Sequence, residues 1–485
     1  CKNFFIIPIK FETLWIEKIF TKVYNLIGVI IMNIKFFNKS SEERRNMILS
    51  ENVFKTIVIL TIPVFMMGIV QALIPITDGL FLNNKAGYII AGAIGFSQSV
   101  INILNAFSQG LSVAASAIIG QMYGKGDIEK TKQASVQILV LAFTIGLILS
   151  PLCVVLSYVI SRGVNKELSA HVFQYLGLYS FVLPFLFMAS IFNSIKNGTG
   201  HPEAPFLRMI ILLVFKIIFN TIFLSILNLG VFGAVSASFM SYFLIGIWMY
   251  YDLFIKKSDM QLSLRNFKFD FEFIKKTMKL AIPSILSYIL VYIGFFLINK
   301  EVVKYGSIAL NASTIASNIN SIYFVLPTSV GTTVTTMISM NIGNGNSKNA
   351  KKIFYYGILF SLMIVLSIII IFTPLNPYIV ELFQKNTEIT TITNKALTIY
   401  MYSVIGFGIF TVEQGVFIGL GRTKMPLLTG IMRVWLLRYI FIIFTEKYLG
   451  VYSIFWGNLF SNCMAAFIFF FFVMKVKWES AIKDI

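Results

Sequence analysis

Apolar runs of about 20 residues, separated by short polar segments, recur along the whole chain. A helix of about 20 residues spans a hydrocarbon core of about 30 Å, so each run predicts one membrane-crossing helix. The runs are 55–82, 88–120, 134–160, 170–195, 206–227, 231–254, 272–298, 306–340, 353–380, 396–420, 427–446 and 451–474. The pattern therefore predicts an all-α polytopic membrane protein with twelve transmembrane helices.

The second half of the chain repeats the first half. Four short segments return after a shift of 219 to 221 residues. The pairs are LTIP at 60–63 and LAIP at 280–283, GKGDIEKTK at 124–132 and GNGNSKNAK at 343–351, GTGHPEAP at 198–205 and GLGRTKMP at 419–426, and NLGVFG at 228–233 and YLGVYS at 448–453. One constant shift predicts two copies of a six-helix unit. Because six is even, both copies enter the membrane from the same side and form two parallel bundles around a central cleft.

This repeat divides the chain into two lobes and three shorter parts. We expect an N-terminal cytoplasmic extension over 1–50, an N-lobe over 51–255, a cytoplasmic linker over 256–272, a C-lobe over 273–478 and a cytoplasmic tail over 479–485. The extension has neither a continuous apolar core nor a small-residue cleavage site, so it does not fit a signal peptide. We expect translation to start at Met32 or Met47, with residues 1–31 upstream or non-native.

The net charge of +19 could indicate a nucleic-acid partner, but its placement indicates membrane orientation instead. Every second loop is rich in Lys and Arg, and the loops between them carry far fewer. The rich segments are 123–133, 196–205, 252–279, 343–352, 421–425 and the tail after 474. Because basic loops stay in the cytoplasm, we expect a multi-pass cell-membrane protein with both termini inside and no nucleic-acid partner.

The sequence contains no motif of an enzyme or of a metal site. Its three cysteines, Cys1, Cys153 and Cys463, have no C-x-x-C spacing, and the P-loop, G-x-S-x-G and H-E-x-x-H patterns are absent. We therefore expect no catalytic activity, no metal and no cofactor.

Five segments together resemble the multidrug and toxic compound extrusion (MATE) family, in that family's order and spacing, from about Ile57 to Lys475. They are LTIPVFMMGIVQALIPITDGLFL, QGLSVAASAIIGQMYGKGDIEKTKQ, NGTGHPEAP, LGVFGAVSAS and RVWLLRYIFIIF. The resemblance implies a V-shaped antiporter that exports small, amphipathic, usually cationic organic molecules by alternating access, driven by protons or sodium ions. Because both lobes lie in one chain, we expect a monomer in the lipid bilayer.

Asp78 is the only charged residue between Thr56 and Asn84, in a run that is otherwise suited to hydrocarbon. A charge at the bilayer centre costs about 2.5–3.5 kcal/mol on insertion scales, so its retention indicates a function or a fixed ion pair between helices. Under the resemblance, Asp78 matches the acid of the family's N-lobe cation site. Pro63 and Pro75 cannot donate helix hydrogen bonds, and we expect both to kink this helix.

The fifth predicted helix departs from the family pattern. Where the family has Asn followed four residues later by an acid, this chain has Lys216 and Asn220. Residues four apart share a helix face, so both should point at Asp78. Ser238 matches a hydroxyl on the family's sixth helix. Because an ammonium paired with Asp78 would repel sodium but not prevent protonation, we expect proton coupling, with sodium coupling as the alternative.

Four further residues are candidates for the cleft: Gln71, Asn193, Glu413 and Arg433. Gln71 lies seven residues before Asp78 and therefore on the same helix face. We expect Glu413 to pair with Arg433 across neighbouring helices, either in the cleft or as a structural pair.

Two other functions are compatible with twelve helices. A flippase for lipid-linked sugars shares the six-plus-six plan, although such flippases tend to line the cleft with more basic residues. An ion channel would need a continuous polar path or a ring of charges, which an acid in one lobe does not supply.

Overall fold

The computed structural model describes residues 39–50, 52–82, 88–164, 166–265, 267–383, 386–479 and 482. The regular secondary structure of these residues is helical, and twelve spans are long and apolar enough to cross a membrane. The spans are Val53–Gly79, Gly92–Lys125, Ile128–Arg162, Lys166–Gly198, Glu203–Ile226, Gly230–Ile255, Phe271–Val303, Gly306–Gly343, Ser347–Phe372, Thr387–Gly419, Lys424–Leu449 and Tyr452–Met474. The twelve-helix, all-α prediction is confirmed; the expectations for residues 1–31 and Met32 lie outside the described residues.

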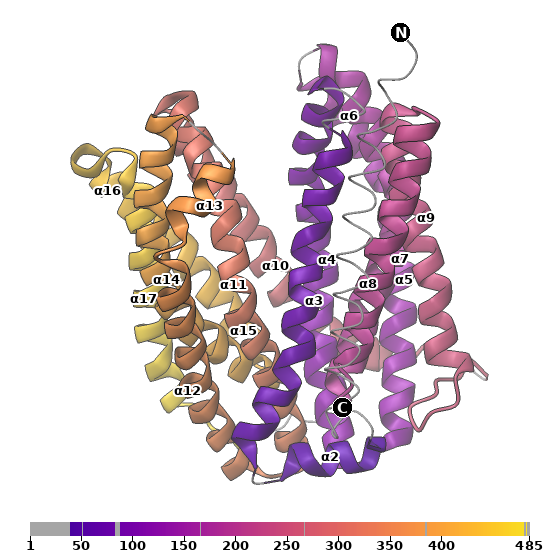
Figure 1. The fold of residues 1–485 in the computed structure, drawn as a ribbon. Helices are drawn as coiled ribbons and strands as arrows, with labels where there is room; N and C mark the ends of the chain where they lie inside the picture. The colour runs from indigo at the N-terminus through magenta and orange to yellow at the C-terminus, as the bar shows by residue number, and fades with distance from the viewer. Residues whose placement is uncertain are drawn as a thin grey trace.

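The helices form two bundles that meet at one end and diverge at the other, which gives a V shape (Figure 1). The first bundle, here called the N-lobe, contains α3 (Val53–Phe81), α4 (Tyr88–Lys125), α5 (Ile128–Arg162), α6 (Lys166–Tyr179), η2 (Ser180–Val182), α7 (Leu183–Gly198), α8 (Glu203–Asn220), η3 (Thr221–Ile226), α9 (Gly230–Tyr250) and η4 (Tyr251–Ile255). The second, the C-lobe, contains α10 (Phe271–Val303), α11 (Gly306–Gly343), α12 (Ser347–Phe372), α13 (Asn376–Phe383), α14 (Thr387–Gly419), α15 (Lys424–Ile431), η5 (Met432–Tyr439), α16 (Ile440–Leu449) and α17 (Tyr452–Met474). A short helix, α2 (Ser41–Leu49), lies at the closed end of the V.

The backbone preserves the internal repeat. Three glycines of the N-lobe have positive φ, and each has a positive-φ counterpart 219 to 221 residues later. The pairs are Gly126 (85°) and Gly345 (76°), Gly200 (78°) and Gly421 (71°), and Gly230 (55°) and Gly450 (54°). Glycine adopts this left-handed conformation without the steric cost that other residues incur. The same turns therefore connect equivalent helices in both lobes.

The boundaries of the ninth predicted span were wrong. The apolar run ended at residue 380, whereas α12 ends at Phe372 and the short helix α13 follows it. Pro374 lies in the turn between the two helices. Because proline has no N–H for the helix hydrogen bond, the chain turns there although its hydrophobicity continues.

Close contacts between α3, α4, α10 and α11 join the two lobes. Thr61 of α3 donates from Oγ1 to Oγ1 of Thr333 in α11 at 3.2 Å. On the other side, α10 approaches α4 so closely that a Cβ atom at Gly110 would lie 2.4 Å from the main-chain nitrogen of Ile285. The first helix of each lobe is therefore packed against the other lobe.

Two reciprocal glycine contacts form the apex of the V. A Cβ at Gly124 of α4 would lie 2.0 Å from the carbonyl oxygen of Met340 in α11. A Cβ at Gly343 of α11 would likewise lie 2.0 Å from the carbonyl oxygen of Gln121 in α4. Any side chain at either position would force the two helices apart. The lobes thus meet backbone to backbone at this end.

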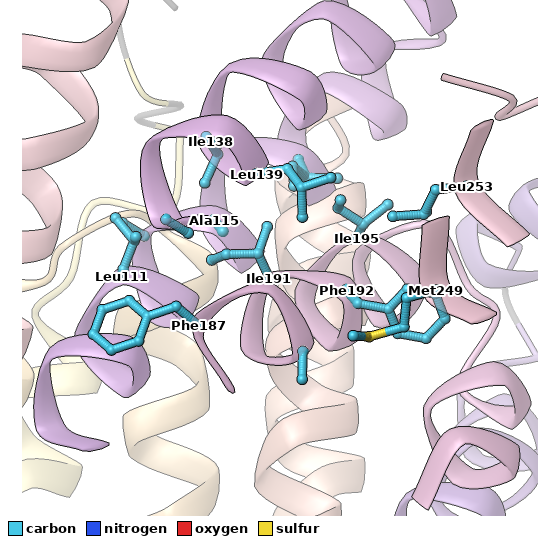
Figure 2. Close-up of a cluster of buried hydrophobic side chains, with 14 of the residues drawn as sticks. Leu111, Ala115, Ile138, Leu139, Phe187, Ile191, Phe192, Ile195, Met249 and Leu253 are labelled. Carbon is cyan, nitrogen blue, oxygen red and sulfur yellow. The ribbon is translucent and has the colours of Figure 1, made fainter. Parts of the chain in front are cut away.

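An apolar cluster inside the N-lobe fixes the helices that carry the polar residues (Figure 2). The labelled members come from α4, α5, α7, α9 and η4 and are Leu111, Ala115, Ile138, Leu139, Phe187, Ile191, Phe192, Ile195, Met249 and Leu253. Val70 of α3 and Leu213 of α8 belong to the same cluster. Because such interiors are close-packed, α3 and α8 are held in a defined register.

Candidate functional site: an ion-paired pocket beside the central cleft

Asp78, Lys216 and Asn220 form one hydrogen-bonded group in the N-lobe. Lys216 Nζ donates to Asp78 Oδ2 at 2.5 Å, and Asn220 Nδ2 donates to Asp78 Oδ1 at 2.8 Å. Lys216 and Asn220 are buried, while the side chain of Asp78 is 26% exposed. Both carboxylate oxygens therefore accept a hydrogen bond, and the ammonium balances the charge. The ion pair expected from the sequence is present.

The local helix geometry brings these groups together. Lys216 and Asn220 lie one turn apart on α8, so they share one face. Directly after Asn220 the chain continues as the π-helix η3, a geometry frequent at functional sites. Asp78 lies in the last turn of α3, three residues after Pro75. Since Pro75 has no N–H, the carbonyl of Gln71 lacks its helix hydrogen bond there, although α3 continues through both Pro75 and Pro63.

A cavity of about 660 Å³ surrounds this group. Its polar lining comes from four helices besides α8 and includes Gln71, Gln98, Asn102, Asn105, Tyr175, Tyr179, Ser238 and Tyr242. Ser238 donates from Oγ to the carbonyl of Ala234 at 3.1 Å, so it lines the pocket without binding Asp78. We call this cavity the N-lobe pocket.

A second cavity, of about 730 Å³, lies between the lobes and is here called the cleft. The N-lobe lines it with residues that include Asn193 and Arg208, and the C-lobe with residues that include Tyr292 and Phe324. Gln71 and Asn105 line both cavities. The N-lobe pocket therefore adjoins the cleft, and Gln71 and Asn193 lie where the sequence predicted them.

Arg208 was not found by sequence reasoning, yet it is the only charged residue among the described residues that line the cleft. It is 3% exposed, and its Nε donates to Asn193 Oδ1 at 3.1 Å. In the sequence Arg208 stands near the start of a span that follows a basic loop, a place where the positive-inside bias alone accounts for an arginine. Only the fold reveals that it faces the cavity.

A polar stripe on α4 was also missed, although the sequence contains its signal. Within a membrane-length helix, polar residues recur every three or four positions, on one face. The stripe consists of Gln98, Asn102, Asn105, Ser108, Gln109, Ser112 and Ser116, all of which line the pocket or the cleft. Such periodicity in an apolar run indicates a water-lined face.

The predicted pair of Glu413 and Arg433 was wrong. Arg433 donates from Nη1 to Asn462 Oδ1 at 3.0 Å, and its guanidinium lies 5.0 Å from the ring centre of Phe410. Glu413 is 1% exposed, and its carboxylate oxygens have no hydrogen-bond partner among the described residues. Phe410 lies about one turn before Glu413 on α14. Arg433 therefore contacts α14 one turn away from Glu413 and does not pair with it. Neither residue belongs to the lining of the pocket or the cleft.

The sequence model of one protein family, MatE, matches residues 63–222 and 283–444. The chain belongs to the MatE family. The two matched segments begin 220 residues apart, so each half of this MatE chain is recognised separately, in agreement with the internal repeat.

Curated relatives and solved structures extend this finding over most of the MatE chain. The probable multidrug resistance protein YpnP of Bacillus subtilis is 24% identical over 431 residues, which cover 86% of this chain and 95% of YpnP. The probable multidrug resistance protein YoeA of the same organism is 21% identical over 79% of this chain and 85% of its own length. An outward-facing multidrug resistance MATE transporter has the same fold, with a TM-score of 0.83 at 23% identity over 88% of this chain and 97% of that one.

Proposed function

We propose that the protein exports amphipathic organic compounds across the cell membrane by alternating access, in exchange for inward-moving protons. The names of the curated relatives support drug export, since they include multidrug resistance and multidrug export proteins. The paired Asp78 and Lys216, in a pocket beside the cleft, carry the assignment of proton coupling.

The occupied carboxylate of Asp78 favours a proton over a sodium ion. Both of its oxygens already accept hydrogen bonds, from Lys216 and Asn220. A sodium ion about 4 Å from the Lys216 ammonium would be repelled by about 4 kcal/mol at an effective dielectric of about 20. A proton can bind Asp78 directly, abolish the ion pair and release Lys216. Protonation thus changes the contact between α3 and α8.

Dye efflux from everted vesicles tests this coupling. With pH and sodium gradients imposed separately, and amphipathic dyes of either charge, we expect the pH gradient alone to drive efflux. Asp78→Asn keeps the shape but cannot titrate, so it should lower proton-driven efflux at least tenfold. Asp252→Asn is the matched control: Asp252 pairs with Lys196 in the same lobe but lies outside the pocket, so this variant should retain coupled efflux.

A second variant tests the role of the lysine. Lys216→Asn combined with Asn220→Asp rebuilds the family's usual residues and should restore a response to sodium, because the pocket then carries two acids and no ammonium. Efflux driven by sodium alone in the unmodified protein, or full activity of Asp78→Asn, would contradict proton coupling through this pair.

A further inference from the structure

The charges that line the two cavities are not balanced. In the N-lobe pocket Asp78 and Lys216 neutralise each other. In the cleft, Arg208 is the single charged side chain among the described lining residues. The described residues of the combined surface therefore present one net positive charge and no free carboxylate to a bound molecule.

Arg208 differs from the other buried cations of the structure. Neighbouring cations are paired with acids: Lys216 with Asp78, Arg44 with Glu203 and Lys196 with Asp252. In the C-lobe, Arg433 and Arg438 lie over aromatic rings instead. Arg208 has one neutral partner, Asn193, and its terminal Nη atoms donate to none of the described residues. Its guanidinium is thus buried at the cavity wall without a counter-charge.

We propose that the exported molecule carries an anionic group, a carboxylate or a phosphate, that binds the guanidinium of Arg208. A buried cation is costly unless it is paired, and guanidinium binds planar oxyanions through two parallel hydrogen bonds. The substrate's own anion would supply the missing partner. This proposal rests on the export function and specifies its substrate class. The family resemblance implies cationic substrates, whereas the lining charge favours the opposite sign.

The rest of the cleft fits an amphipathic anion. Arg208 lies about 7.5 Å along α8 from its start, near the closed end of the V. Ser112, Ser190 and Ser194 line the same region, where their hydroxyl groups hydrogen-bond one another and main-chain carbonyls of α4 and α7. Arg208 is therefore the donor that is left for an anionic head. Phe324 and Tyr292 of the C-lobe line the cleft across from α8 and offer apolar surface for the remainder of the molecule.

Equilibrium binding to the purified protein in nanodiscs of zwitterionic lipid tests the charge preference without any gradient. The probes share one dansyl-alkyl body and end in a carboxylate, a methyl ester or a trimethylammonium group. We expect the carboxylate probe to bind at least tenfold more tightly than the trimethylammonium probe. Arg208→Gln should remove that preference and leave ester binding within about twofold, which also shows that the variant is folded. Arg208→Lys should retain part of the preference for the carboxylate probe, because the positive charge remains but the paired N–H donors of the guanidinium are lost.

Arg433→Gln is the matched control, since it removes a half-buried arginine outside the cleft, and it should bind all three probes as the unmodified protein does. Competition with dodecanoate and dodecyl phosphate then identifies the preferred head group; displacement by either supports the proposal. Tighter binding of the cationic probe, unchanged carboxylate binding in Arg208→Gln, or failure of both competitors would overturn it. Asp78→Asn should keep the anion preference, so failure of proton coupling and failure of anion binding are distinguishable.

Discussion

His201 is a neutral histidine close to two cations, Arg44 and Lys196. It lies in the turn between α7 and α8, where Nδ1–H donates to the carbonyl of Thr199 at 3.0 Å. The hydroxyl of Ser41 lies 3.4 Å from its Nε2. Burial, together with the nearby Arg44 and Lys196, lowers the pKa of His201 from 6.5 to about 3. The imidazole therefore stays uncharged in the folded protein at ordinary pH.

This pKa predicts a loss of stability in acid. Between about pH 6.5 and pH 3 the unfolded chain binds a proton at this histidine that the folded chain does not, so stability is complete above about pH 6.5 and falls as the pH falls. At pH 5 the expected loss is about 2 kcal/mol. The unfolding temperature should fall less between pH 7.5 and pH 5 for His201→Gln than for the unmodified protein. Equal drops in both proteins would refute the assignment.

At the scale of single elements, α2 connects the two lobes at the closed end of the V. On the N-lobe side Arg44 binds Glu203 at 2.5 Å. On the C-lobe side Asn341 Nδ2 donates to the carbonyl of Ile48 at 3.2 Å, and Asn349 Nδ2 to that of Ser50 at 3.2 Å. Because the helix holds both lobes, the V cannot open at this end without breaking one set of contacts.

Weakening α2 should therefore shift the population toward a conformation closed at the other end. Spin labels on cysteines at Glu167 and Glu388, at the divergent ends of the lobes, report that distance by electron paramagnetic resonance. We expect Arg44→Ala combined with Asn341→Ala to add a population at shorter distance.

Lys130→Ala is the control for this experiment. It removes a charge at the same end of the molecule, where Lys130 pairs with Asp127 of its own turn and with no other acid among the described residues, so the distance distribution should not change. An unchanged distribution in the double variant would rule out the connecting role of α2.

The sequence predicted the existence of the elements better than their local geometry. Hydrophobic runs located all twelve spans, and spacing on one helix placed Lys216 and Asn220 beside Asp78. In an α-helix, Arg433 and Arg438 would lie about 140° apart around the axis. They lie instead in the π-helix η5, whose i→i+5 hydrogen bonds bring positions five apart onto nearly one face. Nothing in the residue pattern predicts a π-helix at this place, so the partners of the two arginines could not be deduced from the sequence.

For the whole molecule, the charge pattern and the shape together give an orientation. The basic segment between η4 and α10 is at the end where the lobes meet, and the turn after α16 is at the divergent end (Figure 1). Lys268 belongs to this segment, and its carbonyl accepts a hydrogen bond from Gln137 of α5 at 2.6 Å. If the basic loops are cytoplasmic, the structure is open to the outside and closed to the cytoplasm.

Labelling of intact cells with an impermeant thiol reagent tests this orientation. In a background without native cysteines, Tyr448→Cys should react, because this side chain is 87% exposed at the divergent end. Lys268→Cys, which is also exposed, should react only after the cells are permeabilised. Reaction of Lys268→Cys in intact cells would reverse the orientation.

The glycine contacts at the apex relate the two halves of the molecule by symmetry. Gly124 contacts Met340 while Gly343 contacts Gln121, and 124 and 121 correspond to 343 and 340 in the repeat. Reciprocal contact of equivalent residues is the signature of an isologous interface, as found in two-fold homodimers. The apex thus has the geometry of an isologous interface between the two six-helix halves of one chain. In a two-fold homodimer every residue occurs twice, whereas a single chain can carry an acid in one half only, as it does with Asp78 and its counterpart Ile298.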